Sequence, residues 1–381
     1  MHDHPTQGLV RLALAGALAM AVGVGIGRFV YTPILPPMTE ALGLSRFLAG
    51  LIASANFTGY LVGALLLTRA RLPGSPRAVL TGALLVSAAT TAAMGLAGSV
   101  PLFLLLRFTG GVASALALIL SSSMVLERLA RAGRPGLAAL HFAGVGLGIA
   151  ASAVLVTAMS AAGWDWAGLW WASGALSLVG AILVRALIGA PMTEAAGAAT
   201  AGGRVGNPAL RRMTIAYGLF GFGYVITATF LVVIVRETPA SRDLEPLIWV
   251  VVGLAAAPSI AVWTRVARRL GTGPGYAAAA LTEALGVLVS VSAGGMISLA
   301  VAGILLGGTF MGLTALGLMR ARELAPDNPR PALAALTGAF GVGQIAGPVV
   351  AGFLSDLMGG LLVPSLLAAA GLVVAAWLAR R

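Results

Sequence analysis

The chain has 381 residues, of which 59% are apolar and only 9% are charged, whereas soluble domains carry about 25% charged residues. It contains no Cys and no Lys, which excludes disulfides, thiolate metal sites and the lysines of P-loops and Schiff bases. Three His, two of them in the N-terminal tail, make a poor metal cage, so we expect no metal and no cofactor. The net charge of +12 comes from short arginine clusters between long apolar runs, which indicates orientation in a membrane rather than binding to nucleic acid.

Twelve apolar runs have the length that a bilayer crossing requires, about 20 residues each. Those of the first half are 9–36, 46–68, 78–97, 101–126, 136–160 and 166–188, and those of the second are 211–235, 245–264, 275–293, 297–319, 332–355 and 360–379. Lipid-exposed backbone must be hydrogen-bonded within its own segment, and the runs lack the alternation of barrel strands. We therefore predict an all-α polytopic membrane protein with twelve transmembrane helices in contact with lipid.

The arginines test this number of spans. Of the 24, Arg28 and Arg107 lie inside runs, while Arg46, Arg236 and Arg242 fall on one side of the membrane. The remaining nineteen fall on the other side if all twelve runs cross. Because cytoplasmic loops carry the excess of positive charge, we expect both termini in the cytoplasm.

Short glycine motifs recur in order at an offset of 196 or 197 residues. They are Gly25-Ile26-Gly27 with Gly221-Phe222-Gly223, Gly110-Gly111 with Gly307-Gly308, and Gly144-Val145-Gly146 with Gly341-Val342-Gly343. This repeat predicts two six-helix halves, residues 1–188 and 211–381, joined by a cytoplasmic linker at 189–210. Glycine pairs at four-residue spacing, such as Gly144 and Gly148, predict close helix contacts of the kind that rocking halves need.

Two parallel six-helix repeats around a polar linker resemble the major facilitator superfamily of secondary transporters. The segment Gly25-Ile26-Gly27-Arg28-Phe29-Val30-Tyr31-Thr32-Pro33 resembles the first-helix signature of the YbfB/YjiJ group of bacterial transporters, and Gly341-Val342-Gly343-Gln344-Ile345-Ala346-Gly347-Pro348 resembles its eleventh-helix segment. Arg107-Phe108-Thr109-Gly110-Gly111 is similar to the superfamily's fourth-helix pattern. The resemblance implies alternating access, a location in the bacterial inner membrane and a proton-coupling or helix-packing role for Arg107.

Arg28 and Arg107 are the strongest candidates for function, because an arginine at the centre of a membrane helix costs roughly 2.5–3.5 kcal/mol and normally faces a partner or a wet cavity. Arg28 could hold a carboxylate or phosphate in two parallel hydrogen bonds. The alternative is that it bonds backbone carbonyls freed near Pro33 and Pro36, or reaches outward to the interface. Since both intramembrane charges are cationic, we predict an anionic solute.

Glu283 is the one acid inside a run, which makes it a candidate proton site, although a neutral or Arg-paired structural role fits its peripheral helix. His141 is a second candidate for proton coupling or gating. Uncharged candidates for substrate binding lie on the expected cavity helices, and any of them could instead bond a neighbouring helix. They are Tyr31, Asn56, Tyr217, Tyr224 and Gln344. Tyr224 and Gln344 break the repeat, since they replace Arg28 and Leu147 at its equivalent positions.

Together these features predict a monomeric secondary active transporter that moves a small anionic organic solute and is coupled to protons. The competing transport hypothesis is a proton-coupled exporter of drugs or amphipathic compounds, which would favour an acid in the cavity. A non-transporting membrane sensor or scaffold is a third hypothesis. We expect no enzyme, because the spans hold no nucleophile with a base and no cluster of acids or His.

Overall fold

The computed structural model describes residues 4–69, 74–188, 207–292 and 294–380, and these residues form helices, turns and loops without any strand. Twelve of its helical segments are long and apolar enough to cross a membrane. The predicted fold class is therefore confirmed, and every predicted run matches one of the twelve. Most of the predicted linker, residues 189–206, lies outside the described part of the chain.

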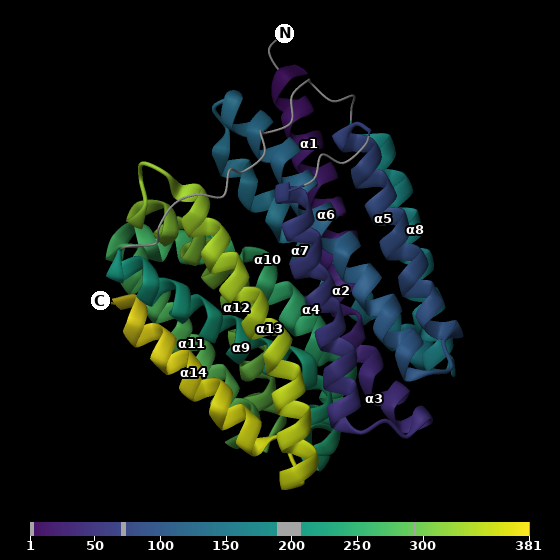
Figure 1. Cartoon of the computed structure of the whole chain (residues 1–381). Helices are drawn as coiled ribbons and strands as arrows, with labels where there is room; N and C mark the ends of the chain where they lie inside the picture. The colour runs from purple at the N-terminus through teal and green to yellow at the C-terminus, as the bar shows by residue number, and fades with distance from the viewer. Residues whose placement is uncertain (1–3, 70–73, 189–206, 293, 381) are drawn as a thin grey trace.

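The first six spans pack together as one group of helices (Figure 1). Their elements are α1 (His4–Met20), η1 (Ala21–Ile26), α2 (Gly27–Phe29), α3 (Tyr31–Leu42), α4 (Arg46–Arg69), α5 (Pro76–Ala93), η2 (Met94–Leu96), α6 (Val100–Arg131), η3 (Pro135–Leu137), α7 (Ala138–Ala161) and α8 (Trp166–Leu187). Within this group α4 packs along α6, and α5 packs along α8.

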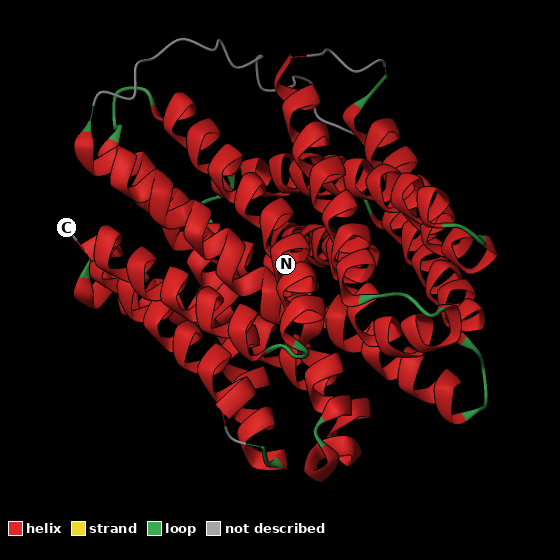
Figure 2. Cartoon of the chain, turned by 60° about the horizontal axis from the view of Figure 1, so that its bottom comes forward, coloured by secondary structure: helices red, strands yellow, loops and turns green. Residues whose placement is uncertain are grey.

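The last six spans form a second group, with α13 and α9 side by side and α11 between α12 and α14. The elements are α9 (Pro208–Glu237), η4 (Pro239–Leu244), α10 (Glu245–Leu270), α11 (Thr272–Ser292), α12 (Met296–Leu324), α13 (Pro329–Met358) and α14 (Leu362–Arg380). Short loops join the helices, as Figure 2 shows.

Several helix ends follow from local sequence. Ser75 and Asp165 accept hydrogen bonds from the backbone N–H groups of Ala78 and Gly168, which caps α5 and α8. These side chains satisfy donors that have no partner within the helix. Gly43 ends α3 with φ at +62°, a conformation that favours glycine.

The first span matches the run predicted over 9–36 and extends over Gly8–Leu42, but it is not one continuous α-helix. It passes through a π-helical stretch at Ala21–Ile26 and a turn at Val30 before it continues to Leu42. Pro33, Pro36 and Pro37 follow this stretch, and proline supplies no N–H to the carbonyl four residues earlier. The irregular backbone therefore lies around Arg28.

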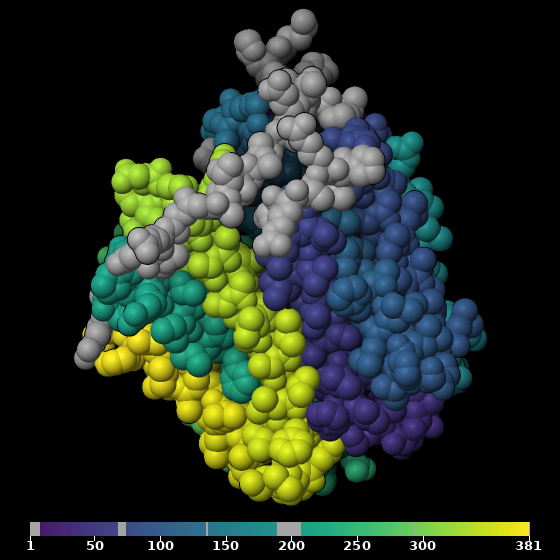
Figure 3. Space-filling view, viewed as in Figure 1, coloured from purple at the N-terminus to yellow at the C-terminus, as the bar shows by residue number. Residues whose placement is uncertain are grey.

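The two groups meet along two equivalent helix pairs, α4 with α13 and α7 with α10. The second pair is so close that a Cβ on Gly146 would clash with the carbonyl oxygen of Gly253. Gly144 and Gly148 also make a close helix contact, but within the first group: a Cβ on either would meet the backbone of the first span. Figure 3 shows the surface recessed between α4 and the α12–α13 pair, towards the end that carries the N-terminus.

Thr32 marks the relation between the repeats. Its hydroxyl donates a 2.8 Å hydrogen bond to the carbonyl oxygen of Ala228, which is 196 residues away. That separation equals the offset of the repeat, so Thr32 contacts the residue at its equivalent position in the second half. Such a contact is expected where a two-fold axis passes between related units.

Candidate functional site

Arg28 lies on α2, beside the boundary between the two groups of helices, and is 7% exposed. Aromatic rings surround its guanidinium. The carbon centre of the guanidinium is 4.3 Å from the ring centroid of Tyr60, 5.0 Å from that of Phe57 and 5.6 Å from that of Phe29. Each such contact contributes up to about 2 kcal/mol when desolvated, and burying the cation costs several kcal/mol.

The hydrogen-bonding capacity of Arg28 is not fully used. Its Nε and Nη2 atoms are buried and have no hydrogen-bond partner among the described residues. An unmade hydrogen bond at a buried group costs about 1–3 kcal/mol, and more at a charge. These two nitrogens share one edge of the planar guanidinium, which is the edge that binds a carboxylate in two parallel hydrogen bonds. Arg28 is thus prepared for an anion.

Tyr224 and Gln344 lie together in the second half. The side-chain amide of Gln344 donates a hydrogen bond from Nε2 to the hydroxyl of Tyr224, and both residues are buried. The Oε1 atom of Gln344 has no partner among the described residues. Whichever way the amide is turned, one of its polar atoms remains unpaired.

Aromatic contacts connect this pair to Arg28 across the boundary. The Tyr224 ring is parallel to those of Phe310 and Phe340, with centroids 5.8 Å apart in both cases. Phe310 in turn meets Phe29 edge-on at 5.9 Å. The Tyr224 phenol also lies within electrostatic range of the Arg28 guanidinium.

A small cavity of about 10 Å³ lies among these rings. Helices of both groups line it, with Phe29 and Ile149 from the first and Tyr224, Trp249 and Phe310 among those from the second. A space of this size holds at most one water molecule. Its walls are aromatic and aliphatic, so the centre of the molecule is closely packed at this level.

Arg107 on α6 is buried as well, but both of its terminal nitrogens are bonded and only its Nε has no partner among the described residues. Its Nη1 donates to the carbonyl oxygen of Gly27 at 3.1 Å and its Nη2 to that of Arg28 at 3.0 Å. The guanidinium also lies 5.0 Å from the ring centroid of Tyr31. Arg107 therefore holds the irregular backbone of the first span and thereby places Arg28.

Two of the predicted substrate-binding residues bond to backbone in the first group. The Tyr31 hydroxyl donates to the carbonyl oxygen of Ala49 at 2.8 Å, and the Asn56 amide donates to that of Arg107 at 3.0 Å. Only Oδ1 of Asn56 is left without a partner among the described residues. The structure brings these side chains together with Arg107 rather than with the free edge of Arg28.

The other predicted residues lie elsewhere in the two groups. The Tyr217 hydroxyl donates to the carbonyl oxygen of Thr314 at 3.0 Å, and its ring stacks on Phe340. His141 pairs with the Ser122 hydroxyl at 3.1 Å between Nε2 and Oγ. A Cβ on Gly16 would clash with the His141 ring, and Gly16 precedes Arg28 by about 18 Å of helix.

Glu283 is fully buried in α11, and neither carboxylate oxygen has a hydrogen-bond partner among the described residues. The Thr309 hydroxyl lies near the carboxylate but donates to carbonyl oxygens of its own helix. The helices that pack most closely against α11 are α12 and α14, so the carboxylate lies within the second group. No group of three or more His, Asp or Glu that could hold a metal occurs in the described part of the chain.

The sequence did not single out several aromatic residues of the site, among them Phe57, Tyr60 and Trp249. Tyr60 follows the candidate Asn56 by four residues, so the helical period placed it near the same face of the second span. Trp249 had no such indication. Its indole N–H donates a 3.1 Å hydrogen bond to the carbonyl oxygen of Phe29, the group that Pro33 leaves without a helical donor.

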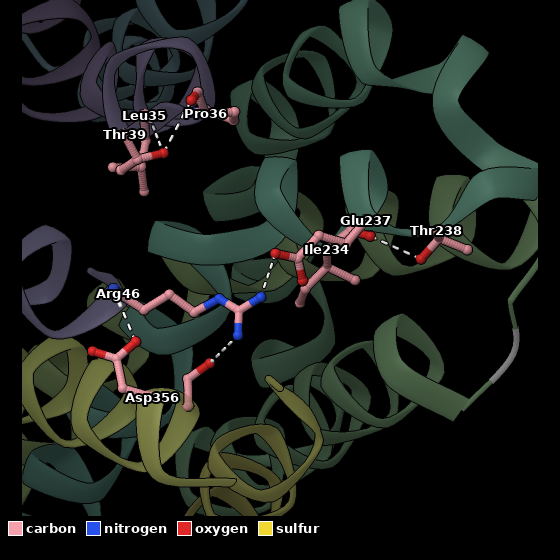
Figure 4. Close-up of polar contacts among 9 residues, drawn as sticks. Leu35, Pro36, Thr39, Arg46, Ile234, Glu237, Thr238 and Asp356 are labelled. Carbon is pink, nitrogen blue, oxygen red and sulfur yellow. Dashed lines mark hydrogen bonds and ion pairs between the residues drawn. The ribbon is translucent and has the colours of Figure 1, made fainter. Parts of the chain in front are cut away.

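A polar latch joins the two groups at the end opposite the N-terminus. The Asp356 carboxylate accepts hydrogen bonds from the backbone N–H groups of Arg46 and Phe47, at 3.1 and 2.9 Å, and so caps α4 from the other group. The Arg46 guanidinium pairs with Glu237 and donates a 3.2 Å hydrogen bond to the Ser355 hydroxyl, whereas the contact with Asp356 in Figure 4 comes from the backbone N–H of Arg46. We call Arg46, Glu237 and Asp356 the latch.

Two further ion pairs lie near the latch. Arg236 pairs with Glu40 of the first group at 3.1 Å and with Glu245 of its own group at 3.7 Å. The three arginines predicted for one side of the membrane thus lie at this end, since Arg242 donates a 3.4 Å hydrogen bond to the carbonyl oxygen of Arg236. Exposed pairs contribute about 0–1 kcal/mol each, so a cluster of this kind suits a contact that must open.

The family model described as the uncharacterised MFS-type transporter YbfB matches residues 20–380. The chain belongs to this family. The family confirms a membrane transporter of the major facilitator superfamily rather than an enzyme. Comparison with curated protein sequences finds no match.

Solved transporter structures share the fold. A point mutant of the nucleoside transporter NupG is 16% identical, with a TM-score of 0.75 over 97% of this chain and 98% of that one. A D-xylose–proton symporter is 15% identical, with a TM-score of 0.73 over 98% and 97% of the two chains. A bacterial homologue of the human lysosomal transporter Spinster, inward-facing and occupied, is 14% identical, with a TM-score of 0.69 over 100% and 97%.

Proposed function

We propose that this YbfB-family chain is a secondary active transporter that moves a small anionic organic solute across the bacterial inner membrane by alternating access, as a monomer coupled to protons. The observation that carries the proposal is the free edge of Arg28. A buried cation with two unused donors lowers the stability of the protein, and an anion that pairs with both donors would recover that cost when it binds. Arg28 lies at the boundary between two six-helix halves, and transporters of this kind bind their solutes at that boundary.

The side chains around Arg28 support an anion over a cation. Three rings lie against the guanidinium, and no carboxylate of the described residues is paired with it. A cationic drug would bring a second positive charge into this low-dielectric region, where like charges repel strongly. The exporter hypothesis is therefore disfavoured by the residues of the site.

For proton coupling we favour Glu283 among the three predicted residues. Both terminal nitrogens of Arg107 donate hydrogen bonds to backbone carbonyl oxygens, and His141 is hydrogen-bonded to Ser122. The Glu283 carboxylate is buried without a described hydrogen-bond partner, and a buried acid binds and releases protons more readily than an arginine can. D-xylose–proton symport occurs in a protein of the same fold.

Alternating access requires that the two ends of the molecule open in turn. We assign the latch to the periplasmic end, because both termini and most arginines are predicted in the cytoplasm. In this structure the latch holds that end together. Binding at Arg28 and opening of the latch would then alternate as the halves rock about the α4–α13 and α7–α10 contacts.

The test uses purified protein in liposomes that contain a pH-sensitive dye. A panel of organic acids, amino acids, sugars and cationic drugs is screened for solute-dependent proton movement, with Arg28→Met and the control Arg131→Met measured in parallel. Arg131 is 60% exposed and pairs with Glu127 one helical turn away, so its loss removes a charge without touching the site. We expect an anion to give a signal that Arg28→Met abolishes and Arg131→Met retains.

Other outcomes would contradict the proposal in distinct ways. Signals with cationic drugs alone would establish the exporter hypothesis instead. Anion movement that is unchanged in Arg28→Met would show that the solute binds elsewhere. A solute that binds and stabilises the folded protein without crossing the bilayer would favour a sensor or scaffold.

A further inference from the structure

We infer that the solute is a monocarboxylate built on a flat ring, with a hydroxyl or amide group at its far end. This inference rests on the proposed function and adds the chemical class of the solute. Three features of the site carry it: the free edge of Arg28, the rings that surround it and the unpaired amide atom of Gln344.

The positive charge of the site matches a solute that carries one negative charge. Arg28 and Arg107 are the buried arginines of the site, and the terminal nitrogens of Arg107 already donate to the carbonyl oxygens of Gly27 and Arg28. The edge of Arg28 formed by Nε and Nη2 remains, and it matches the two oxygens of one carboxylate. A phosphate or dicarboxylate would bring a second charge for which the described site offers no free cation.

The rings favour a flat apolar body. Tyr60, Phe57 and Phe29 lie against the guanidinium, which leaves its unpaired edge for the carboxylate. Beyond it, the Tyr224 ring stacks on Phe310 and on Phe340 near the boundary between the halves, so protein rings occupy its faces in this closed arrangement. When the halves part, a ring of the solute would take the place of one of them. Offset stacking on such faces favours an aromatic ring over a saturated ring of similar size.

Gln344 and Tyr224 provide the second polar contact. Tyr224 accepts a hydrogen bond from the Gln344 amide, which leaves the phenol hydrogen free to donate and the Gln344 Oε1 free to accept. A hydroxyl or amide both donates and accepts, so it would satisfy both groups. A site built to bond such a group discriminates strongly against an analogue that lacks it, because its own buried atoms are then left unpaired.

The experiment measures ligand-induced shifts in the melting temperature of the full chain in lipid nanodiscs. The probes are para-hydroxybenzoate, benzoate, cyclohexanecarboxylate, terephthalate and the uncharged methyl ester of para-hydroxybenzoate. Their concentration dependence yields affinities, because a ligand that binds only the folded protein stabilises it by mass action. We expect para-hydroxybenzoate to bind best, benzoate next and the saturated, dianionic and uncharged probes at least about tenfold more weakly.

Two variants assign the contacts. In Gln344→Leu, which restores the residue of the equivalent position Leu147, para-hydroxybenzoate should lose about tenfold in affinity, and benzoate should bind as to the wild type. In Arg28→Lys, which keeps the charge and loses the fork, both ring carboxylates should weaken by about tenfold. The melting temperature of each variant without ligand shows that it is folded.

The outcomes separate this inference from the proposed function. If a dianion or a saturated carboxylate binds best and depends on Arg28, the chemical class inferred here is wrong and the anion transporter stands. If the uncharged ester binds as well as the acid, and equally well to Arg28→Lys, both are wrong. Absence of any shift with the ring monocarboxylates on folded protein would also overturn the inference.

Discussion

Arg28 and Arg107 are the two arginines inside membrane spans, and they are similarly buried, at 7% and 5% exposed. The structure gives their terminal nitrogens different hydrogen bonding. Both terminal nitrogens of Arg107 donate to carbonyl oxygens of the first span, which leaves only its Nε unpaired, whereas Nε and Nη2 of Arg28 both have no partner among the described residues. A buried charge that the fold satisfies is structural, and a buried charge that it leaves open is suited to a ligand. The comparison predicts variants whose effects on stability differ in sign.

The largest effect is expected for Arg107→Met. It removes two hydrogen bonds from a charged donor, each worth about 1.5–3 kcal/mol, and releases the irregular backbone that carries Arg28. We expect a loss of about 3 kcal/mol in stability, measured as a lower melting temperature in nanodiscs, together with loss of transport. Arg107→Lys should recover part of the stability. An unchanged melting temperature would show that Arg107 does not hold this backbone.

The second effect is that Arg28→Met abolishes anion transport while the ligand-free protein becomes more stable. Removal of an uncompensated buried charge should raise stability by roughly 1 kcal/mol, after the loss of the three ring contacts is allowed for. The measurement pairs transport with the melting temperature of the same sample. A variant that melts well below the wild type would place Arg28 with Arg107 among the structural residues.

The latch gives a third, intermediate prediction. Asp356→Asn removes the charged cap of α4, worth about 1 kcal/mol, and should shift the balance of the two access states roughly fivefold towards an open latch. Because the chain has no Cys, a single Ala49→Cys, at a position 1% exposed beside the groove next to the latch, reports opening by its rate of labelling.

The matched control for the latch is Glu127→Gln. It also breaks an ion pair, with Arg131, but within one helix of one half. Its labelling rate should equal that of Ala49→Cys alone. Equal rates in Asp356→Asn and the control would mean that the latch does not set the access state.

The smallest effect is expected for Trp249→Phe. It removes the indole N–H that serves the carbonyl oxygen of Phe29, a neutral hydrogen bond worth about 1 kcal/mol. Stability should fall by about that amount, and the concentration for half-maximal transport should rise severalfold because α2 shifts. If the transport constants are unchanged, Trp249 supports the interface between the halves without placing Arg28.

Much of the candidate site could be predicted from residue type and position. Arg28 stood out because a charge inside an apolar run is costly, and Tyr224 and Gln344 because they break the repeat. The structure adds that Tyr31, Asn56 and Arg107 form one backbone-holding cluster and that His141 lies far from Arg28 along the first span. Those assignments depend on which acceptor atom each donor bonds, and the periodicity of the sequence carries no information about that.

The sequence by itself determined the twelve spans and, in outline, their boundaries. Apolar length and the requirement for internal hydrogen bonding fix a membrane helix locally, without reference to its neighbours. The tertiary structure alone decided which intramembrane charge is satisfied, because the partners are backbone atoms and rings on other helices. The carbonyl oxygen of Phe29 meets Trp249 from 220 residues away, and Asp356 caps α4 from 310 residues away. Such pairings arise only when the two halves come together.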